Sequence, residues 1–405
     1  MFRLNHIIGT CIFVTAFLLT ISAHAGTYYV ATTGSNGNPG TSTKPWRTIA
    51  YATAQMGAGD TTYVRGGTYY EGQIRFKRSG TSSAPIKFLR APGESPIIEF
   101  ADKASSKQVR FENLSGSRYP IGWITFEGFQ VRNAYDGIKI YNGHDLTIRQ
   151  NSIQNSKVQG ILGNGTRILI DRNRINNNGS SDSYDHGIYM AGTAIIVTNN
   201  LIYGNRCHGI QVNGTLSYNA STHPGSEYAR SANWVISNNT IAYNRCPGVV
   251  LWGNTPGVRA ENNIFYENAI TKGSTTAQGI NFISQTGTGI VIRNNLAYAT
   301  GSGGTKFLGT AAKEGTHYTQ SGNTVNTVNP KFVNAPATLP SSPNFSLASG
   351  SPAIDKGLPL SLSSTKISYP GTTRPKGTTH DVGAYEYNSS TSQLLIAAPT
   401  SAQAN

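Results

Sequence analysis

The chain has few charged residues, and acidic residues are the scarcest of them. Of its 405 residues, 19 are aspartate or glutamate and 33 are lysine or arginine, which gives a formal net charge of +14. This excess of positive charge favours an acidic partner. The alternative is that the charge is an adaptation to solubility or to a cell surface. No basic run with interleaved aromatic residues is present, so we expect no nucleic-acid partner.

Long apolar runs are also missing after the first 25 residues. The N-terminus combines Arg3, an apolar span from Ile7 to Ile21 and the small-residue ending Ala23-His24-Ala25. This arrangement is typical of a secretory signal, so residues 1–25 are expected to be removed and the product to be secreted or periplasmic. No second run is long enough to cross a bilayer, and we predict no membrane span.

Helical patterns are almost absent as well. Only Thr48–Met56, which follows Pro45-Trp46, has an amphipathic helical pattern. Glycine is frequent, with 45 residues, and hydrophobic residues make up 38% of the chain. These values indicate a turn-rich β protein with ample material for a core.

One short pattern repeats from Trp123 to Tyr298: a strand, an Asn-rich turn, a second apolar strand, a variable loop, and Gly followed by an aliphatic residue. The Gly-aliphatic pairs are 23, 27, 22, 39 and 31 residues apart, which indicates a solenoid with loops of variable length. They begin at Gly137, Gly160, Gly187, Gly209, Gly248 and Gly279. Copies of the first part include ILIDRNRINNN, AIIVTNNLIYGN, WVISNNTIAYN, VRAENNIFYEN and IVIRNNLAYA.

A unit this short cannot bury its own apolar face and must stack on its copies. In Gly187-Ile188-Tyr189-Met190 the aliphatic side chains alternate with tyrosine, as in a strand with one buried face. We therefore predict a right-handed parallel β-helix with strands about 4.8 Å apart. The turn asparagines are expected to tolerate a left-handed backbone and to bond their counterparts in the next coil. They are Asn151, Asn173, Asn200, Asn239, Asn263 and Asn295.

We predict one elongated domain over residues 26–387. Residues 26–100 form an N-terminal cap and the first coils, with helix Thr48–Met56 covering the open end of the stack. Residues 123–300 form the regular coils, and residues 301–387 the final coils and a segment that closes the far end. Residues 388–405 have no periodicity and are expected to be disordered.

Two of the three cysteines recur at the same place in consecutive copies. They lie in Asn205-Arg206-Cys207-His208-Gly209 and Asn244-Arg245-Cys246-Pro247-Gly248. If the coils stack in register, their α-carbons are about 5 Å apart, which suits a disulfide in an oxidising compartment. A pair of buried free thiols is the alternative.

The repeat resembles that of secreted β-helix polysaccharide lyases, C5-epimerases and some glycosidases. The resemblance implies a substrate groove along the strands that begin at the Gly-aliphatic pairs, with an anionic polysaccharide as the partner. The outward residues of these strands are Lys139, Leu162, Tyr189, Gln211, Val250 and Asn281. The residues that precede the glycines are Asp136, Gln159, His186, His208, Pro247 and Gln278.

Ionisable residues in the middle coils match the removal of a uronate C5 proton, which needs a base, a proton donor and a cation that neutralises the carboxylate. Arg206, Lys139 or His208 is expected to neutralise charge. Tyr189 or His186 is expected to act as base or acid, with Asp185 orienting a histidine. Lys139, Gln211, Trp252 and Asn281 are expected to bind substrate.

Each of these assignments has a structural alternative. Either histidine can be a hydrogen-bonded corner residue, Tyr189 a surface rung of the stack, and Lys139 a solvated side chain. We expect no resident cofactor. The one metal hypothesis is calcium bound by Asp171, Asp182 and Asp185, although their spacing matches no diagnostic pattern.

The sequence favours a monomeric lyase that cleaves a uronic-acid polymer, such as alginate or pectate, by β-elimination. A C5-epimerase is an alternative because Tyr203–Ile210 is similar to an epimerase coil, but the Asp-Pro-His signature of those enzymes is missing. The carboxylate motifs of β-helix polygalacturonases are absent, which argues against hydrolysis. The second alternative is a non-catalytic glycan binder that uses Tyr135, Tyr141, Tyr189 and Trp252 as stacking platforms.

Overall fold

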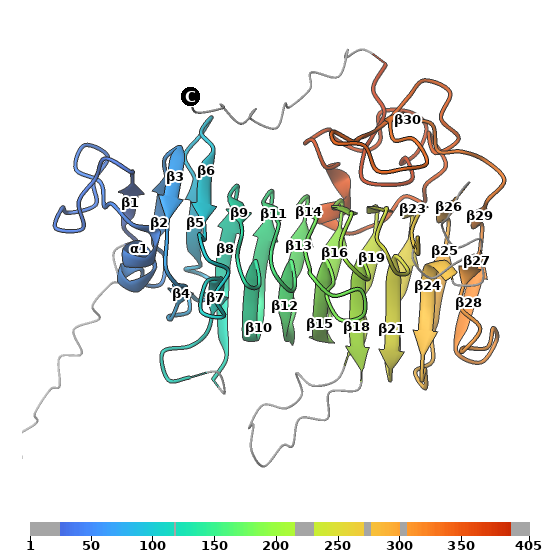
Figure 1. Cartoon of the computed structure of the whole chain (residues 1–405), viewed down its shortest axis with the longest axis horizontal. Coiled ribbons are helices and arrows are strands. Elements are labelled where there is room, and N and C mark those ends of the chain that lie inside the picture. Colours follow the sequence, from blue (N-terminus) through green and yellow to red (C-terminus); the bar gives the residue numbers. More distant parts are fainter. Residues whose placement is uncertain (1–24, 117–118, 215–230, 271–276, 300–305, 390–405) are drawn as a thin grey trace, which may run out of the picture.

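The computed structural model describes residues 25–116, 119–214, 231–270, 277–299 and 306–389. Parallel strands stack side by side along one axis and form an elongated solenoid (Figure 1). The predicted parallel β-helix is confirmed. The predicted signal segment and most of the predicted C-terminal tail lie outside the described residues.

Each regular coil contributes one strand to each of three faces. The first face holds the strands that follow the Gly-aliphatic pairs and their N-terminal counterparts: β4 (Ile74–Phe76), β7 (Val109–Phe111), the start of β10 (Ile138–Arg149), β12 (Ile161–Thr166), β15 (Ile188–Thr193), β18 (Ile210–Gly214), β21 (Val249–Gly253), β24 (Ala277–Ile283) and β27 (Lys306–Leu308).

The second face holds β1 (Thr27–Val30), β2 (Thr61–Val64), β5 (Ile86–Arg90), β8 (Ile121–Glu127), the end of β10, β13 (Leu169–Asp171), β16 (Ile196–Thr198), β19 (Val235–Ser237), β22 (Arg259–Glu261), β25 (Ile290–Arg293) and β28 (Tyr318–Ser321). The third face holds β3 (Gly67–Tyr70), β6 (Pro96–Glu99), β9 (Gln130–Arg132), β11 (Ser152–Gln154), β14 (Arg174–Asn176), β17 (Leu201–Tyr203), β20 (Thr240–Ala242), β23 (Ile264–Tyr266), β26 (Leu296–Tyr298) and β29 (Thr324–Val325).

The interior is filled by rows of apolar side chains, one residue from each coil. On the first face such a row is fixed by the strand register and is fully buried. It consists of Ile138, Ile161, Ile188, Ile210, Val249 and Ile280. The residues that follow these point outward, because side chains alternate along a strand.

Asparagine side chains link the coils at the turn between the second and third faces. Asn173 Nδ2 donates to Asn200 Oδ1 at 3.1 Å, and Asn200 Nδ2 donates to Asn239 Oδ1 at 3.0 Å. The same bond continues through Asn263 and Asn295. The predicted bond between counterparts is therefore confirmed. The left-handed backbone, however, lies one residue earlier, as at Asn199 (φ 55°) and Asn238 (φ 53°), because the ladder residue itself must aim its amide along the axis.

A second asparagine ladder, which the sequence analysis did not identify, lies after the third-face strands. Asn178 Nδ2 donates to Asn205 Oδ1 at 3.0 Å, and Asn205 and Asn244 continue the row at 2.9 Å per bond. Asn205 and Asn244 directly precede the Arg-Cys pairs of their coils. The second ladder therefore fixes the register next to Cys207 and Cys246, which occupy the same position in the two copies.

Helix α1 (Ile49–Gln55) forms where the sequence predicted it, at the N-terminal end of the stack (Figure 1). The Thr48 side chain caps it by accepting from the Tyr51 backbone N–H, and Ile49 and Ala52 are buried. The function of α1 as a cover for the first coil stays a prediction.

The C-terminal segment was predicted to close the far end of the stack. It instead folds back along the third face (Figure 1). It includes the antiparallel pair β30 (Phe332–Asn334) and β31 (Asn344–Leu347) and a short 3-10 helix, Ser363–Lys366. Outward side chains of β17 and β23, such as Tyr203 and Tyr266, are buried in one cluster with Phe345. A buried ion pair of Arg374 and Glu386, at 3.0 Å, lies within this segment.

We expect Asn200→Ala to lower the free energy of unfolding by about 3 kcal/mol or more. The substitution unpairs several buried groups, including the Asn173 backbone N–H and the Ile170 carbonyl, and each such group costs about 1–3 kcal/mol. The measurement is the urea midpoint, with the exposed Asn254→Ala as the matched control. Equal midpoints for the two variants would contradict a stabilising ladder.

Candidate functional site

The predicted outward row of the first face exists, and its side chains differ in accessibility. The register aligns Lys139, Leu162, Tyr189, Gln211, Val250 and Asn281 on consecutive strands. Gln211 and Val250 are buried, whereas Lys139, Tyr189 and Asn281 are partly exposed. Trp252, one outward position further along β21, is 36% exposed. Accessible chemistry on this row therefore centres on Lys139 and Tyr189.

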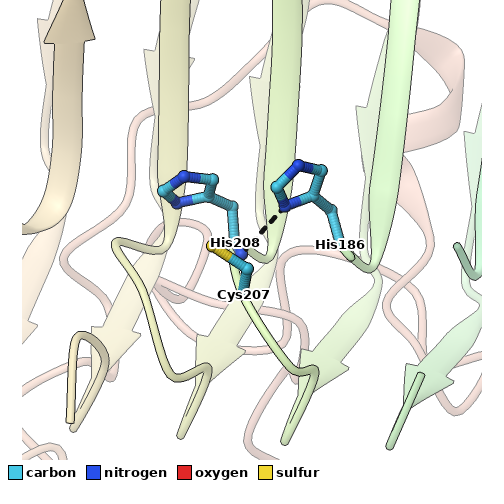
Figure 2. Close-up of side chains that lie close together, drawn as sticks. All are labelled: His186, Cys207 and His208. Carbon is cyan, nitrogen blue, oxygen red and sulfur yellow. Dashed lines mark hydrogen bonds between the residues drawn. The ribbon is translucent and has the colours of Figure 1, made fainter. Parts of the chain in front are cut away.

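His186, His208 and Tyr189 form one cluster where the chain enters β15 and β18 (Figure 2 shows the two histidines). The two imidazole rings stack with their centroids 5.0 Å apart, about one strand spacing, as predicted. The Tyr189 ring meets His186 edge-on, with centroids 5.5 Å apart. Consecutive coils thus bring all three rings together.

His186 is a neutral hydrogen-bond acceptor in this cluster. Its Nδ1 accepts from the His208 backbone N–H at 3.2 Å, so Nδ1 carries no proton (Figure 2). Burial, reinforced by the positive charge that His208 can carry, lowers the pKa of His186 to about 2. His186 is therefore a poor base near neutral pH, and its geometry favours the corner-residue interpretation.

His208 is the opposite tautomer, with the proton on Nδ1. Its Nδ1 lies 3.1 Å from the Pro247 carbonyl oxygen, which can only accept, so Nδ1 carries the proton. In the neutral ring the lone pair is then on Nε2. Pro247 occupies the position that corresponds to His208 in the next coil, so the strand register fixes this tautomer.

Tyr189 is held by the next coil. Asn213 Nδ2 donates to the Tyr189 hydroxyl oxygen at 2.6 Å. This bond uses the hydroxyl oxygen as an acceptor and leaves the Tyr189 O–H group as a donor. The sequence analysis did not identify Asn213, although its outward position in β18, two residues after Gln211, was a usable signal.

Arg206 is paired with a loop that connects β14 to β15. Its Nε lies 2.6 Å from Asp182 Oδ1, and Arg245 Nε lies 3.5 Å from the same oxygen. Arg206 and Asp182 are both about 40% exposed. Arg245 was missed by the sequence analysis, although it occupies the position of Arg206 in the next copy. Asp182 thus gathers two cations beside the cysteines.

Asp185, predicted to orient a histidine, shapes this loop instead. Its Oδ2 accepts from the backbone N–H groups of Ser180 and Ser181, each at 2.6 Å. A carboxylate that accepts two adjacent amide groups closes a tight loop, which explains why this oxygen does not reach an imidazole. Gln159 completes the loop by donating to the Tyr184 carbonyl at 2.7 Å.

The three aspartates of the calcium hypothesis have separate partners. Asp171 bonds Arg172 at 2.8 Å and also Asn199, while Asp182 and Asp185 bind the groups given above. Within the described ranges, one group of three His, Cys, Asp or Glu side chains has ligand atoms within 4.8 Å of one another: His186, Cys207 and His208. The three aspartates are therefore not assembled into an oxygen cluster for calcium.

The His–Cys–His group is not suited to a metal ion either, because Cys207 is bonded to Cys246. The predicted disulfide is confirmed, with α-carbons 4.6 Å apart and both residues buried. The disulfide joins the residues that precede His208 and Pro247. It therefore ties together the two coils whose hydrogen bond sets the His208 tautomer.

An open cavity of about 540 Å³ lies elsewhere, between β27 and β28 at the C-terminal end of the stack. Its lining includes Leu308, Lys313 and Tyr318. Its lining contains none of the predicted site residues.

We expect the pair Cys207→Ser and Cys246→Ser to lower the free energy of unfolding by about 4 kcal/mol, the chain-entropy value for a closed loop of 39 residues. Urea unfolding of the wild type in a phosphine reductant should approach the variant's midpoint. The reductant should leave the variant unchanged, which serves as the control. A wild type that keeps its midpoint after complete reduction, verified by thiol titration, would contradict a stabilising disulfide.

Comparison with known sequences agrees with the fold. The family model described as Pel9A-like, right handed beta helix region, matches residues 28–199, and the model described as right handed beta helix region matches residues 114–297. Among curated proteins, a segment of the uncharacterized protein YwoF of Bacillus subtilis is 39% identical over 79 residues, 20% of this chain and 17% of that protein. Pectate lyase PEL9 of Emericella nidulans is 42% identical over 76 residues, 18% of each chain.

These segments span less than a fifth of either curated relative. The likeness to a solved structure is broader: pectate lyase Pel9A aligns with 90% of this chain and 96% of its own, with a TM-score of 0.55 and 18% identity. At that identity the likeness concerns the fold. The two family models, the parallel three-faced stack and this structural likeness agree, and the chain is a right-handed parallel β-helix protein.

Proposed function

We propose that the chain is a polysaccharide lyase that cleaves a uronic-acid-containing polymer by β-elimination. The observation that carries the proposal is the convergence of buried His208 and partly exposed Tyr189, whose rings both contact the His186 ring. A histidine that served only as a hydrogen-bonded corner residue would need no tyrosine in the same cluster. Convergence of a base and a proton donor is what elimination requires.

In the proposed reaction His208 is the base. Its Nδ1–H donates to Pro247, so Nε2 is the atom that accepts the C5 proton of the uronate. The imidazolium that forms is stabilised through the same hydrogen bond, now charge-assisted. His186 acts as a positioning residue, because it accepts the His208 backbone N–H.

Tyr189 is the proposed acid. As the C4–O4 bond breaks, the departing oxygen takes the phenolic proton, and Asn213 Nδ2 stabilises the phenolate that remains. Tyr189 and His208 come from neighbouring coils. A sugar that lies across both strands therefore meets the base at C5 and the acid at O4.

Arg206 is the proposed group that neutralises the uronate carboxylate. In the structure it pairs with Asp182, so it must exchange that partner for the substrate. Since both side chains are about 40% exposed, breaking their ion pair costs at most about 1 kcal/mol. Neutralisation makes the C5 proton more acidic by lowering the energy of the enolate-like intermediate.

The net charge of +14 supports an acidic polymer as substrate, and the similarity to a pectate lyase supports a uronate. The signal-like N-terminus and the disulfide support a secreted or periplasmic enzyme. No helix within the described residues is long and apolar enough to cross a membrane. A C5-epimerase would share the first proton transfer and differ in the second step.

The assay for the proposal is the ultraviolet absorbance of the unsaturated uronate that β-elimination leaves, on alginate, pectate and hyaluronan. We expect product with at least one polymer. His208→Ala and Tyr189→Phe should each lower kcat roughly 100- to 10,000-fold, the contribution typical of a general base or acid. The matched controls are His317→Ala and Tyr70→Phe, residues remote in sequence from the cluster, and these should keep wild-type rates.

A second readout separates the alternatives. Exchange of the uronate C5 proton with deuterated solvent, without unsaturated product, would replace the lyase with an epimerase. Neither product nor exchange on any polymer, from protein with wild-type stability, would overturn catalysis on these polymers and favour a non-catalytic binder.

A further inference from the structure

Three cations occupy consecutive strands near the N-terminal end of the first face. Arg75 on β4, Arg110 on β7 and Lys139 on β10 are aligned by the strand register. The same outward row continues through Leu162 on β12 to Tyr189 on β15. We call Arg75, Arg110 and Lys139 the cationic row. Only Lys139 was identified from the sequence.

Two acidic side chains hold the cationic row in place. Glu112 lies 2.9 Å from the Nε of both Arg75 and Arg110, and Lys139 Nζ lies 3.3 Å from Asp136. Glu112 and Asp136 are buried, whereas the three cations are about a quarter exposed, at 26%, 23% and 23%. The anions thus lie beneath and the cations above, so the accessible part of the row is positive.

Ion pairing within the row leaves donors for another partner. Arg75 Nη2 donates to the Asn113 carbonyl and Arg110 Nη2 donates to Glu112 Oε1, while the Nε atoms of both arginines lie in ion-pair contact with Glu112 Oε2. Neither set of bonds uses Nη1. Because the guanidinium groups of Arg75 and Arg110 are already oriented, a ligand anion would bind them with little further loss of side-chain entropy.

The ion pairs with Glu112 and Asp136 offset only part of the charge of the cationic row, which holds three cations against two acids. Like charges on directly neighbouring strands are destabilising. On the second face the protein pairs opposite charges instead: Arg149 lies 2.7 Å from Glu127 on the adjacent strand, and Arg293 makes the same kind of contact with Glu261. The row therefore carries one positive charge more than these acids offset, and a ligand carboxylate would balance it.

Tyr141 adds an aromatic surface next to the row. The Arg110 guanidinium lies 4.6 Å, and Lys139 Nζ 5.6 Å, from the centre of its ring. A cation held against the face of an aromatic ring gains about 0.5–1 kcal/mol at an exposed site, so Tyr141 helps to fix the two cations in place. Tyr141 follows Lys139 by two residues and so points to the same side of β10.

We propose that the cationic row binds successive carboxylates of an acidic polysaccharide that runs along the solenoid axis, on the N-terminal side of His208 and Tyr189. This inference rests on the proposed function and adds to it a set of uronate-binding positions. The strands are about 4.8 Å apart, a length of the same order as one sugar unit in an extended chain. Lys139 is two strands from Tyr189, and Arg75 is four strands away.

The variants for the test are Arg110→Gln, Lys139→Gln and the triple change that adds Arg75→Gln. Arg47→Gln and Lys87→Gln, at exposed positions outside the row, are the charge-matched controls. We expect each single change to raise KM for the polymer roughly tenfold at unchanged kcat, as for the loss of one charge-assisted hydrogen bond. Short oligouronides that occupy only the strands around Tyr189 should show a smaller rise in KM than the polymer does.

Binding measured without turnover keeps this inference separate from the proposed function. In the His208→Ala background, affinity electrophoresis in gels with pectate or alginate should show weaker retardation for the row variants than for the controls. Equal retardation would overturn the row even if the wild type is an active lyase. Weaker retardation with no lyase activity in the wild type would support the row and reject the lyase.

Specificity is tested in the same gels with DNA and dextran sulfate, two polyanions that contain no uronate. Retardation by DNA or dextran sulfate that equals that by the uronate polymers, and falls equally in the row variants, would overturn uronate binding in favour of general polyanion binding. Retardation that falls only for the uronate polymers would support the proposal.

Discussion

The hydrogen bond that one buried asparagine donates to its counterpart in the next coil is the interaction on which the molecule depends. Each Asn amide both donates to and accepts from neighbouring coils, so a shift of one residue would leave several buried groups unpaired. Such a shift would also turn the outward row of the first face into the interior, since side chains alternate along a strand. The ladders therefore decide which side chains are available for chemistry.

The candidate site is a direct consequence of this register. The hydrogen bonds that define it cross from one coil to the next: His186 to His208, His208 to Pro247, and Tyr189 to Asn213. No single coil contains an active arrangement. A histidine in such a corner receives its tautomer from the backbone group beside it, a carbonyl for His208 and an N–H for His186. The chemical difference between the two histidines therefore comes from their position in the stack and not from the residue type.

The repeat allowed the strands, the first-face row, the disulfide and the Asn bond to be predicted, because each follows from one period applied several times. The covering of the third face was missed, although a signal was present: Leu201-Ile202-Tyr203 and Ile264-Phe265-Tyr266 have no alternation and are buried on both sides, unlike Ser152-Ile153-Gln154. The ion pair of Asp182 with Arg206 and the bonds of Asp185 were not predictable, because they depend on the path of a loop that no period constrains.

Loops of very different length leave the register of the strands intact. The candidate site lies beside the coil with the longest step between repeated glycines. The cost of closing a loop grows only slowly with its length, so a coil can lengthen without moving its strands. The step from Gly209 to Gly248, 39 residues, is the longest of those between the repeated glycines, yet Asn205 and Asn244 keep their 2.9 Å bond across it. The disulfide spans the same 39 residues and offsets the added closure entropy at the coil where it is largest. Because Cys207 adjoins His208, the crosslink that stabilises the longest coil also holds the His208 ring against the Pro247 carbonyl.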